Sequence, residues 1–201
     1  MTKIYRLYLE LLKKYGKPKP WPWQEDSIPS SPFEICVGAI LTQNTNWQNV
    51  EKAIGNLKKA KVLTVEKLRT MPCGKVEELI KPSGFYRQKA ERLQIFCRHL
   101  GQKYRGKMEK LWEKELVELR QELLSLKGVG PETADTMILY AGKKPIFVID
   151  EYTRRFAKRH RLTQDFSYKN LQKLFMKNLP KNVKIYEDLH ALIVKDGKMS
   201  K

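Results

Sequence analysis

Apolar residues recur every three or four positions over most of this chain, which is the spacing that places side chains on one face of an α-helix. The clearest stripe predicts a central, buried helix and consists of Phe33, Cys36, Val37, Ile40 and Leu41. Sustained alternation with a period of two residues, which is typical of half-buried strands, does not occur in the sequence. We therefore expect an all-α fold.

The same spacing, read with capping residues, sets the expected helix positions. Helices are predicted from residue 33 and over residues 2–15, 64–71, 75–81, 86–102, 115–126, 151–160, 167–178 and 183–195. Another helix should begin after Thr45, which forms a capping-box pattern with Gln48. Five prolines in residues 16–32 predict an extended loop, and the apolar run 146–149 predicts a buried extended link that ends at Asp150.

The charge balance favours a polyanionic partner. The chain has 40 Lys and Arg residues against 22 Asp and Glu residues, a net charge of +18 and a pI near 9.8. Such an excess is typical of nucleic-acid-binding proteins, although lysine-rich surfaces also occur in proteins that are simply well solvated. Charge by itself specifies no reaction.

The cysteines and the apolar residues bear on cofactors and location. Cys36, Cys73 and Cys97 lie far apart in the sequence, and no Cys-x-x-Cys spacing indicates zinc or an iron–sulfur cluster. No apolar run approaches the roughly 18 residues of a membrane span, and the N-terminus lacks a signal-peptide pattern. We expect a reduced, cytoplasmic, nucleoid-associated protein with no metal and no membrane partner.

A glycine-rich turn joins two predicted helices at Leu126-Lys-Gly-Val-Gly130, and Pro131 suits the first position of the second helix. Amides of Gly128, Val129 and Gly130 at this helix N-terminus would bind phosphate without regard to base sequence. The alternative is an ordinary turn between helices. The residues around the turn distinguish the two interpretations.

The segment Leu126–Ala134, followed by Phe147-Val-Ile-Asp150, resembles the helix-hairpin-helix and aspartate loop of the endonuclease III superfamily of DNA glycosylases. Gly38–Thr45 and Pro82–Ala90 match the same family in order and spacing, and the resemblance covers about residues 30–198. It implies a two-lobed fold with a DNA-binding cleft between the lobes. One lobe would comprise residues 1–32 and about 145–201, and the other residues 33–144, with the helix-hairpin-helix at about 115–141. The implied partner is double-stranded DNA with a damaged base, bound by a monomer.

Asp150 is the expected catalytic residue, because the resemblance places it against the sugar of the extruded nucleotide. Breaking an N-glycosidic bond builds positive charge on the sugar, which a fixed carboxylate stabilises while it positions or deprotonates water. Without the resemblance, an Asp after an apolar run is more simply a helix N-cap, with Thr153 or Arg154 supplying the capped amide.

Two departures from the family pattern bear on activity and cofactors. Relatives that also cleave the strand carry a lysine two residues after the second hairpin glycine, where this chain has Glu132, although Lys127 is a nearby amine. Relatives with an iron–sulfur cluster carry four C-terminal cysteines that this sequence lacks. We therefore expect a monofunctional glycosylase without a cluster, and the resemblance leaves open a monovalent cation at the hairpin carbonyls.

These departures, with the Leu-Thr-Gln-Asn-Thr and Pro-Ser-Gly-Phe-Tyr motifs, are most similar to the 3-methyladenine DNA glycosylase III branch, which excises alkylated purines. An alkylated purine carries positive charge, so aromatic rings can select it by stacking. Trp47 is a pocket candidate by its motif position, and Trp21 and Trp23 are candidates by composition alone. All three could instead be core or lobe-bridging aromatics.

Two more DNA contacts are implied by motif position, and two by their place beside one of these residues. Asn44 corresponds to residues that fill the space of the extruded base, and Phe85 to residues that wedge the opposite strand. Their alternatives are a helix-capping amide and a buried interhelical phenylalanine. Arg87 and Lys89, beside Phe85, are placed to contact phosphates, unless they are solvated surface charges.

Three other functions compete with the alkylpurine glycosylase. A non-catalytic helix-hairpin-helix protein would clamp DNA without needing Asp150. A bifunctional lyase for oxidised pyrimidines is disfavoured by Glu132. A uracil or thymine mismatch glycosylase remains open, because related monofunctional enzymes also lack the lysine.

Overall fold

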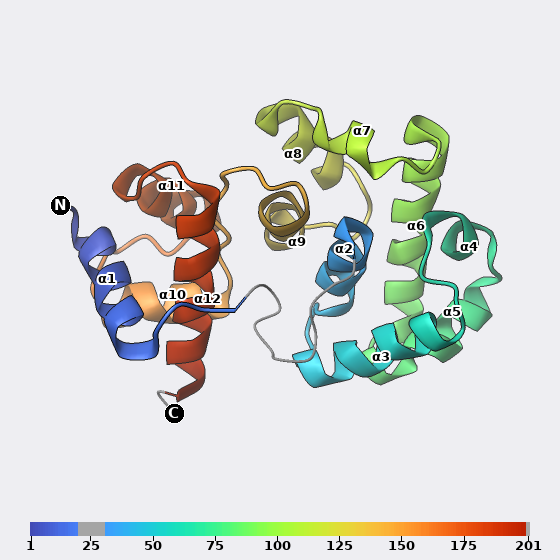
Figure 1. Cartoon of the computed structure of the whole chain (residues 1–201), viewed down its shortest axis with the longest axis horizontal. Helices are drawn as coiled ribbons and strands as arrows, with labels where there is room; N and C mark the ends of the chain where they lie inside the picture. The colour runs from blue at the N-terminus through green and yellow to red at the C-terminus, as the bar shows by residue number, and fades with distance from the viewer. Residues whose placement is uncertain (20–30, 200–201) are drawn as a thin grey trace. The chain divides into compact units, whose positions relative to one another are not determined.

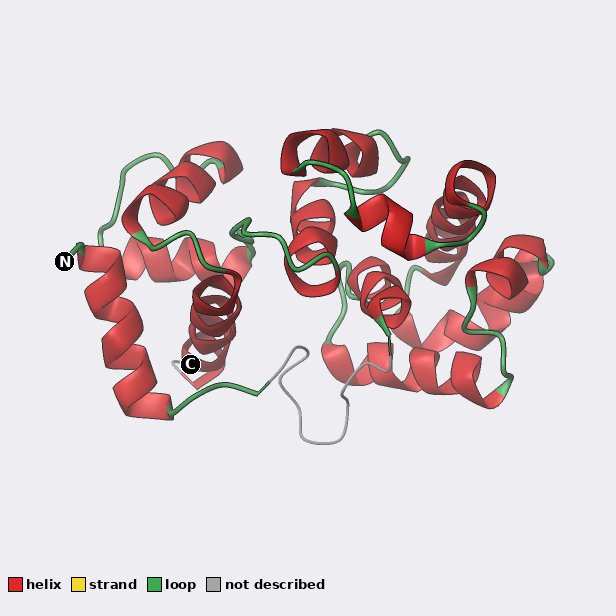
Figure 2. Ribbon diagram, turned by 45° about the horizontal axis from the view of Figure 1, so that its top comes forward, coloured by secondary structure: helices red, strands yellow, loops and turns green. Residues whose placement is uncertain are grey.

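A computed structural model describes residues 1–19 and 31–199 of the chain. The described residues form α-helices, short 3-10 and π segments and connecting loops, with no β-strand among them (Figure 2). The all-α expectation is therefore confirmed. The chain divides into two compact units, which are described separately: residues 1–19 with 138–199, and residues 31–137. The division falls between residues 137 and 138, inside the helical stretch 131–141, whereas the sequence placed the lobe boundary at about residues 144 and 145.

The first unit is built around its C-terminal helix. Its α-helices are α1 (Lys3–Tyr15), α10 (Glu151–Arg159), α11 (Tyr168–Asn178) and α12 (Val183–Met199). Helix α12 packs against α1 and α10 (Figure 1), and its inward face includes Leu189 and Leu192, which are fully buried. The expected extended link 146–149 is confirmed, since it is buried and non-helical, and Phe147 stacks on Phe175 of α11.

The second unit is assembled along one long helix. Its elements are α2 (Pro32–Leu41), α3 (Trp47–Lys59), α4 (Val65–Thr70), α5 (Cys73–Ile80), η1 (Lys81–Ser83), α6 (Tyr86–Tyr104), α7 (Met108–Trp112), α8 (Leu116–Leu124) and α9 (Pro131–Thr136). Helices α4 and α5 lie along α6 (Figure 1). Helix α2 is buried from Cys36 to Leu41, which confirms the predicted central helix.

Three local features differ from the sequence predictions. Helix α3 is capped by Asn46, whose side chain accepts from the Asn49 amide at 3.0 Å, so the predicted cap at Thr45 is wrong by one residue. The short α7 was not predicted. The helix that follows the hairpin turn changes to a π segment, η2 (Met137–Ala141), where the sequence predicted a regular α-helix.

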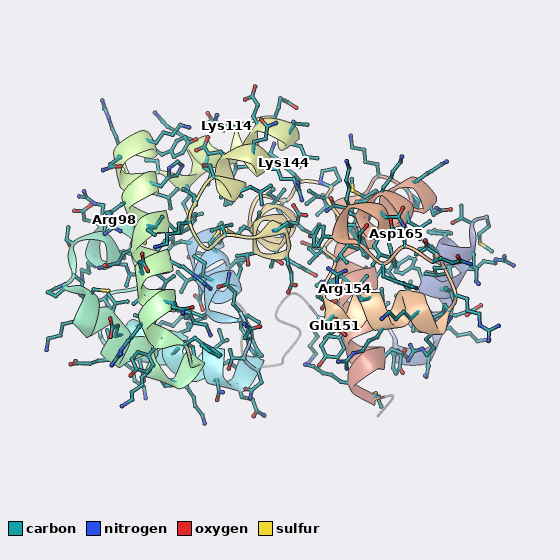
Figure 3. All side chains as sticks on the ribbon, turned by 180° about the vertical axis from the view of Figure 1, so that it is seen from behind. Arg98, Lys114, Lys144, Glu151, Arg154 and Asp165 are labelled. Atoms are coloured by element: carbon teal, nitrogen blue, oxygen red, sulfur yellow. The ribbon has the colours of Figure 1, made fainter. Side chains whose placement is uncertain are left out.

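Charged side chains lie on the surface of both units. Figure 3 labels Arg98 on α6, Lys114 before α8 and Arg154 on α10, of which Arg98 is exposed and the other two are half-buried. Among the described residues, no helix is long and apolar enough to cross a membrane. No group of three or more His, Cys, Asp or Glu side chains in the same described ranges could hold a metal ion.

Candidate active site and DNA-binding elements

The carboxylate of Asp150 caps α10. Oδ1 accepts a hydrogen bond of 2.7 Å from the Thr153 amide, and the Asp150 backbone is extended, as an N-cap requires. The buried link 146–149 fixes the approach to this cap, and the Asp150 side chain is 16% exposed. Capping therefore occupies one oxygen and leaves the other available for chemistry, so the two interpretations of Asp150 do not exclude each other.

The second oxygen of Asp150 faces a histidine on α12. Nε2 of His190 lies 3.3 Å from Oδ2, and Nδ1 lies 2.7 Å from the hydroxyl of Tyr140. Burial raises the pKa of the Asp150 carboxyl, but His190 and the Thr153 hydrogen bonds outweigh it and hold the pKa below its ordinary value. Asp150 is consequently an anion at neutral pH.

Tyr140 and Asp150 contact the two ring nitrogens of His190. Burial, and then nearby carboxylates, raise the pKa of Tyr140 well above its ordinary value, so the phenol keeps its proton. The Tyr140 hydroxyl holds Nδ1 of the His190 ring at 2.7 Å, and this places Nε2 on the side of Asp150, 3.3 Å from Oδ2. The His190 ring, held by Tyr140, thus helps to orient the Asp150 carboxylate. Sequence reasoning missed both partners, because a lone histidine on an apolar helix face usually indicates packing.

The hairpin turn (residues 126–130) joins α8 to α9 with a backbone that requires glycine at one position. Gly128 has φ +86°, in the left-handed region that disfavours side chains, and Gly130 is the N-cap of α9. The Val129 amide donates to the Leu126 carbonyl at 3.0 Å and the Val129 side chain is buried. Val129 therefore anchors the turn internally, which corrects the expectation that its amide points outward to phosphate.

Two polar side chains brace the hairpin turn. Nε2 of Gln43 donates to the Gly128 carbonyl at 3.0 Å and to Oγ1 of Thr133 at 2.9 Å, while its Oε1 accepts from Arg92. The Arg92 side chain also occupies the space into which a Cβ at Gly128 would project. Gln43 lies inside the Leu-Thr-Gln-Asn-Thr motif, but its role was not predicted. The monovalent cation expected at the hairpin carbonyls stays a prediction, and the Gly128 carbonyl is already engaged by Gln43.

Asn44 and Phe85 are both exposed and both have left-handed backbones, with φ of +53° and +44°. A positive φ is uncommon for a bulky residue and often marks a functional position. The Phe85 side chain is 63% exposed, so it is not the buried interhelical phenylalanine that was the alternative. Asn44 is not the cap of α3 either, since Asn46 is. Arg87 is exposed on the first turn of α6.

Lys89 does not contact phosphates, because its side chain is fully buried. Its ammonium donates to the carbonyls of Leu41, at 2.8 Å, and Ser83, at 2.6 Å. Burial, and then the charge of Arg92, lower the pKa of Lys89 to about 8. The expectation of a phosphate ligand here is wrong.

Comparison with known proteins identifies the family. Residues 37–181 match the model of the HhH-GPD superfamily of base excision DNA repair proteins. A Methanocaldococcus jannaschii protein named as a candidate DNA repair glycosylase is 42% identical over 97% of this chain and 87% of its own length. The chain belongs to the HhH-GPD superfamily. It is a DNA repair glycosylase, as the resemblance in its motifs implied.

Solved structures agree with this assignment of the HhH-GPD chain. The H. pylori 3-methyladenine DNA glycosylase, solved with 1,N6-ethenoadenine, is 28% identical with a TM-score of 0.83, over 98% of both chains. A non-covalent endonuclease III–DNA complex is 26% identical with a TM-score of 0.78, over 96% of this chain and 83% of its own. Among curated sequences, Thermotoga maritima endonuclease III is 35% identical over 65% of this chain and 57% of its own length. DNA is therefore the partner of this glycosylase.

Two charged side chains, Glu132 and Lys127, lie at the hairpin turn of this glycosylase. Glu132 is exposed in the first turn of α9, where a negative charge is favoured by the helix dipole. Lys127 lies in the turn itself, and its ammonium pairs with Glu91 at 2.7 Å. The position of the expected lyase amine is thus held by a carboxylate.

Of the three expected pocket tryptophans, one can be placed. Trp47 is half-buried at the first position of α3, directly after the N-cap Asn46. Trp21 and Trp23 lie outside the described residues. Their place in a base pocket stays a prediction.

Replacing His190 with phenylalanine should lower the rate of base release by about tenfold or more and move its acid limb to higher pH. The ring shape survives, but the group that holds the Asp150 pKa down is lost, so the carboxylate is protonated at a higher pH. Single-turnover rates measured across pH check this. His160→Phe is the matched control, because His160 packs on Phe156 and is not among the groups that act on the Asp150 pKa. An unmoved acid limb in His190→Phe would contradict the assigned role.

Proposed function

We propose that this protein is a monofunctional DNA glycosylase that hydrolyses the N-glycosidic bond of alkylated purines such as 3-methyladenine. The observation that carries the proposal is Glu132, a carboxylate at the hairpin position where strand-cleaving relatives have an amine. A carboxylate cannot form an imine with the sugar, so water is the nucleophile that remains. The likeness to the H. pylori 3-methyladenine glycosylase supports the choice of base.

In this mechanism Asp150 acts on the sugar. As the base departs, positive charge develops on the sugar, and the anionic Oδ2 stabilises it and orients the attacking water. His190 and the Thr153 amide keep the carboxylate ionised and fixed. An alkylated purine already carries positive charge and leaves readily, so a carboxylate with water is sufficient for such a substrate.

The second unit binds the DNA around the damaged nucleotide. Amides at Gly128 and Gly130 bind phosphate at the N-terminus of α9, and Arg87 adds a charge contact. Asn44 fills the place of the extruded base and Phe85 wedges the opposite strand. Trp47 stacks on the base. The exposure and the left-handed backbones of Asn44 and Phe85 support these two insertion roles.

We further propose that the 201 residues function without an iron–sulfur cluster. Such clusters take four thiolate ligands, and the sequence holds three cysteines. Cys36 and Cys97 are buried, and burial raises the pKa of both thiols, that of Cys97 to about 12. Iron analysis of the purified protein tests this proposal, and stoichiometric iron with sulfide would contradict it.

The test of the substrate is a panel of duplexes containing methylated purines, uracil, mismatched thymine or an oxidised pyrimidine. Released bases are identified by mass spectrometry before any alkali treatment, and a parallel reaction contains borohydride. We expect release of 3-methyladenine, intact strands and no trapped adduct. Release of uracil or thymine alone would replace the proposed substrate, a trapped adduct would show lyase chemistry, and binding without any release would leave only a DNA clamp.

A further inference from the structure

Lys89 forms a buried connection between two segments of the second unit. It lies in the first turn of α6, and its ammonium reaches the last residue of α2 at Leu41 and the last residue of η1 at Ser83. The residues that supply these two carbonyls, Leu41 and Ser83, are 42 positions apart in the sequence. One cation therefore binds the last carbonyls of two helical segments at once.

Each of these segments leads directly into a loop with an exposed, left-handed residue. Leu41 precedes residues 42–46, which carry Asn44, and Ser83 precedes residues 84–85, which carry Phe85. We call these two stretches the insertion loops. The ammonium of Lys89 thus holds the beginning of both loops, while the residues expected to enter the duplex lie two or three positions further on.

The two hydrogen bonds are required for the Lys89 ammonium to remain buried. A buried ammonium without acceptors is costly, so the two carbonyl hydrogen bonds must form for the side chain to remain inside. The C-terminal end of α2 also favours a cation through the helix dipole. The atoms of α2 and η1 that contact the Lys89 ammonium are carbonyl oxygens. The charged group that lowers the pKa of Lys89 is Arg92, which lies on the same helix, α6.

We propose that Lys89 is a positioning residue that holds both insertion loops in the geometry needed to enter DNA. The proposal rests on the insertion roles of Asn44 and Phe85, and it does not depend on which base is excised. Arg92, which braces the hairpin turn through Gln43, is one helical turn away, so the same face of α6 supports both the phosphate-binding turn and the insertion loops.

The first test compares Lys89→Met with Gln94→Met. Gln94 is a matched control, because it is also buried on α6 and donates to two carbonyls, those of Leu68 and Met71, at the end of α4 rather than at the insertion loops. Both variants should melt at lower temperature. Only Lys89→Met should lose base extrusion, by about 10- to 100-fold, because small displacements of positioned groups have effects of this size.

Extrusion is measured by the fluorescence of 2-aminopurine, placed either opposite or next to an abasic-site analogue. This assay requires no assumption about which damaged base is excised. Asn44→Ala and Phe85→Ala are run alongside. If these two variants extrude normally, the insertion roles are wrong and the proposal fails with them, whereas the substrate assignment is unaffected. Equal losses in Lys89→Met and Gln94→Met, or no loss in folded Lys89→Met, would overturn the role of Lys89 itself.

A second test uses the wild-type protein and so does not depend on a variant that folds. The protonated ammonium donates two charge-assisted hydrogen bonds, which the neutral amine makes more weakly, and the pKa of Lys89 is about 8. Extrusion should therefore be highest below that pH and decline as pH rises through it. Extrusion by Lys89→Met should be low and independent of pH over the same range. A flat wild-type profile between neutral pH and the denaturation limit would count against the proposal.

Discussion

Asp150→Asn should reduce base release by at least about 100-fold while duplex affinity changes only a few-fold. Asparagine is nearly isosteric and is itself a good N-cap, so its side-chain oxygen can keep the hydrogen bond from the Thr153 amide that starts α10. What is lost is the negative charge of Oδ2, on which the proposed stabilisation of the sugar depends. Single-turnover base release and fluorescence anisotropy with an intact duplex measure the two quantities separately.

Asp165→Asn is the matched control for this experiment. Asp165 is an exposed aspartate of the same unit whose carboxylate accepts from the Ser167 amide at 2.8 Å, so it has a comparable local hydrogen bond on a loop before α11. This variant should retain both release and binding. If Asp150→Asn retained its rate, the charge would not be catalytic, and if it lost affinity and rate in equal measure, Asp150 would be structural.

Much of the fold follows from the periodicity of the sequence, because long amphipathic segments have few alternatives. Helix α6 extends over 19 residues with an apolar stripe, and its predicted start is the observed one. Helix α7 has five residues, too few to show a repeat, and so was missed. The π segment η2 was missed for a different reason, since residues 137–141 are all apolar or aromatic and all buried, so the sequence shows no polar face from which a helical period could be read.

The residues of the candidate site could be predicted where they belong to a recognisable motif. They could not be predicted where their role depends on burial or on contacts with distant segments. Asp150, Asn44 and Phe85 occur in recognisable segments, and the latter two are exposed, as the proposed insertion roles require. Lys89 was assigned to the surface because lysines are usually there. A signal for burial existed, since Lys89 lies at helical spacing from Leu93, on the buried stripe of α6. The hairpin brace needed three dimensions, because Gln43 and Gly128 are 85 residues apart.

Asp135→Ala should destabilise the protein by about 3 kcal/mol, the lower end for a buried ion pair, because Asp135 is buried but 28% of the Arg120 side chain stays in contact with water. Asp135 of α9 is fully buried and accepts two hydrogen bonds from Arg120 of α8, at 2.7 and 3.1 Å. The pair joins the two helices on either side of the hairpin turn. Chemical denaturation followed by circular dichroism measures the loss in the free energy of unfolding. Duplex affinity should fall as well, because the pair supports the turn that is proposed to bind phosphate.

Glu66→Ala is the matched comparison, because Glu66 also forms a bidentate pair with an arginine, Arg69, in the same unit, but 68% of its side chain is exposed. Its removal should cost about 1 kcal/mol or less, since exposed pairs gain little over water. The double variant Arg120→Met with Asp135→Leu separates the two contributions to the buried pair. If its stability approaches that of the wild type while duplex affinity stays low, the pair sets the geometry of the hairpin rather than its stability. Stability as low as in Asp135→Ala would instead mean that the ion pair itself holds α8 and α9 together.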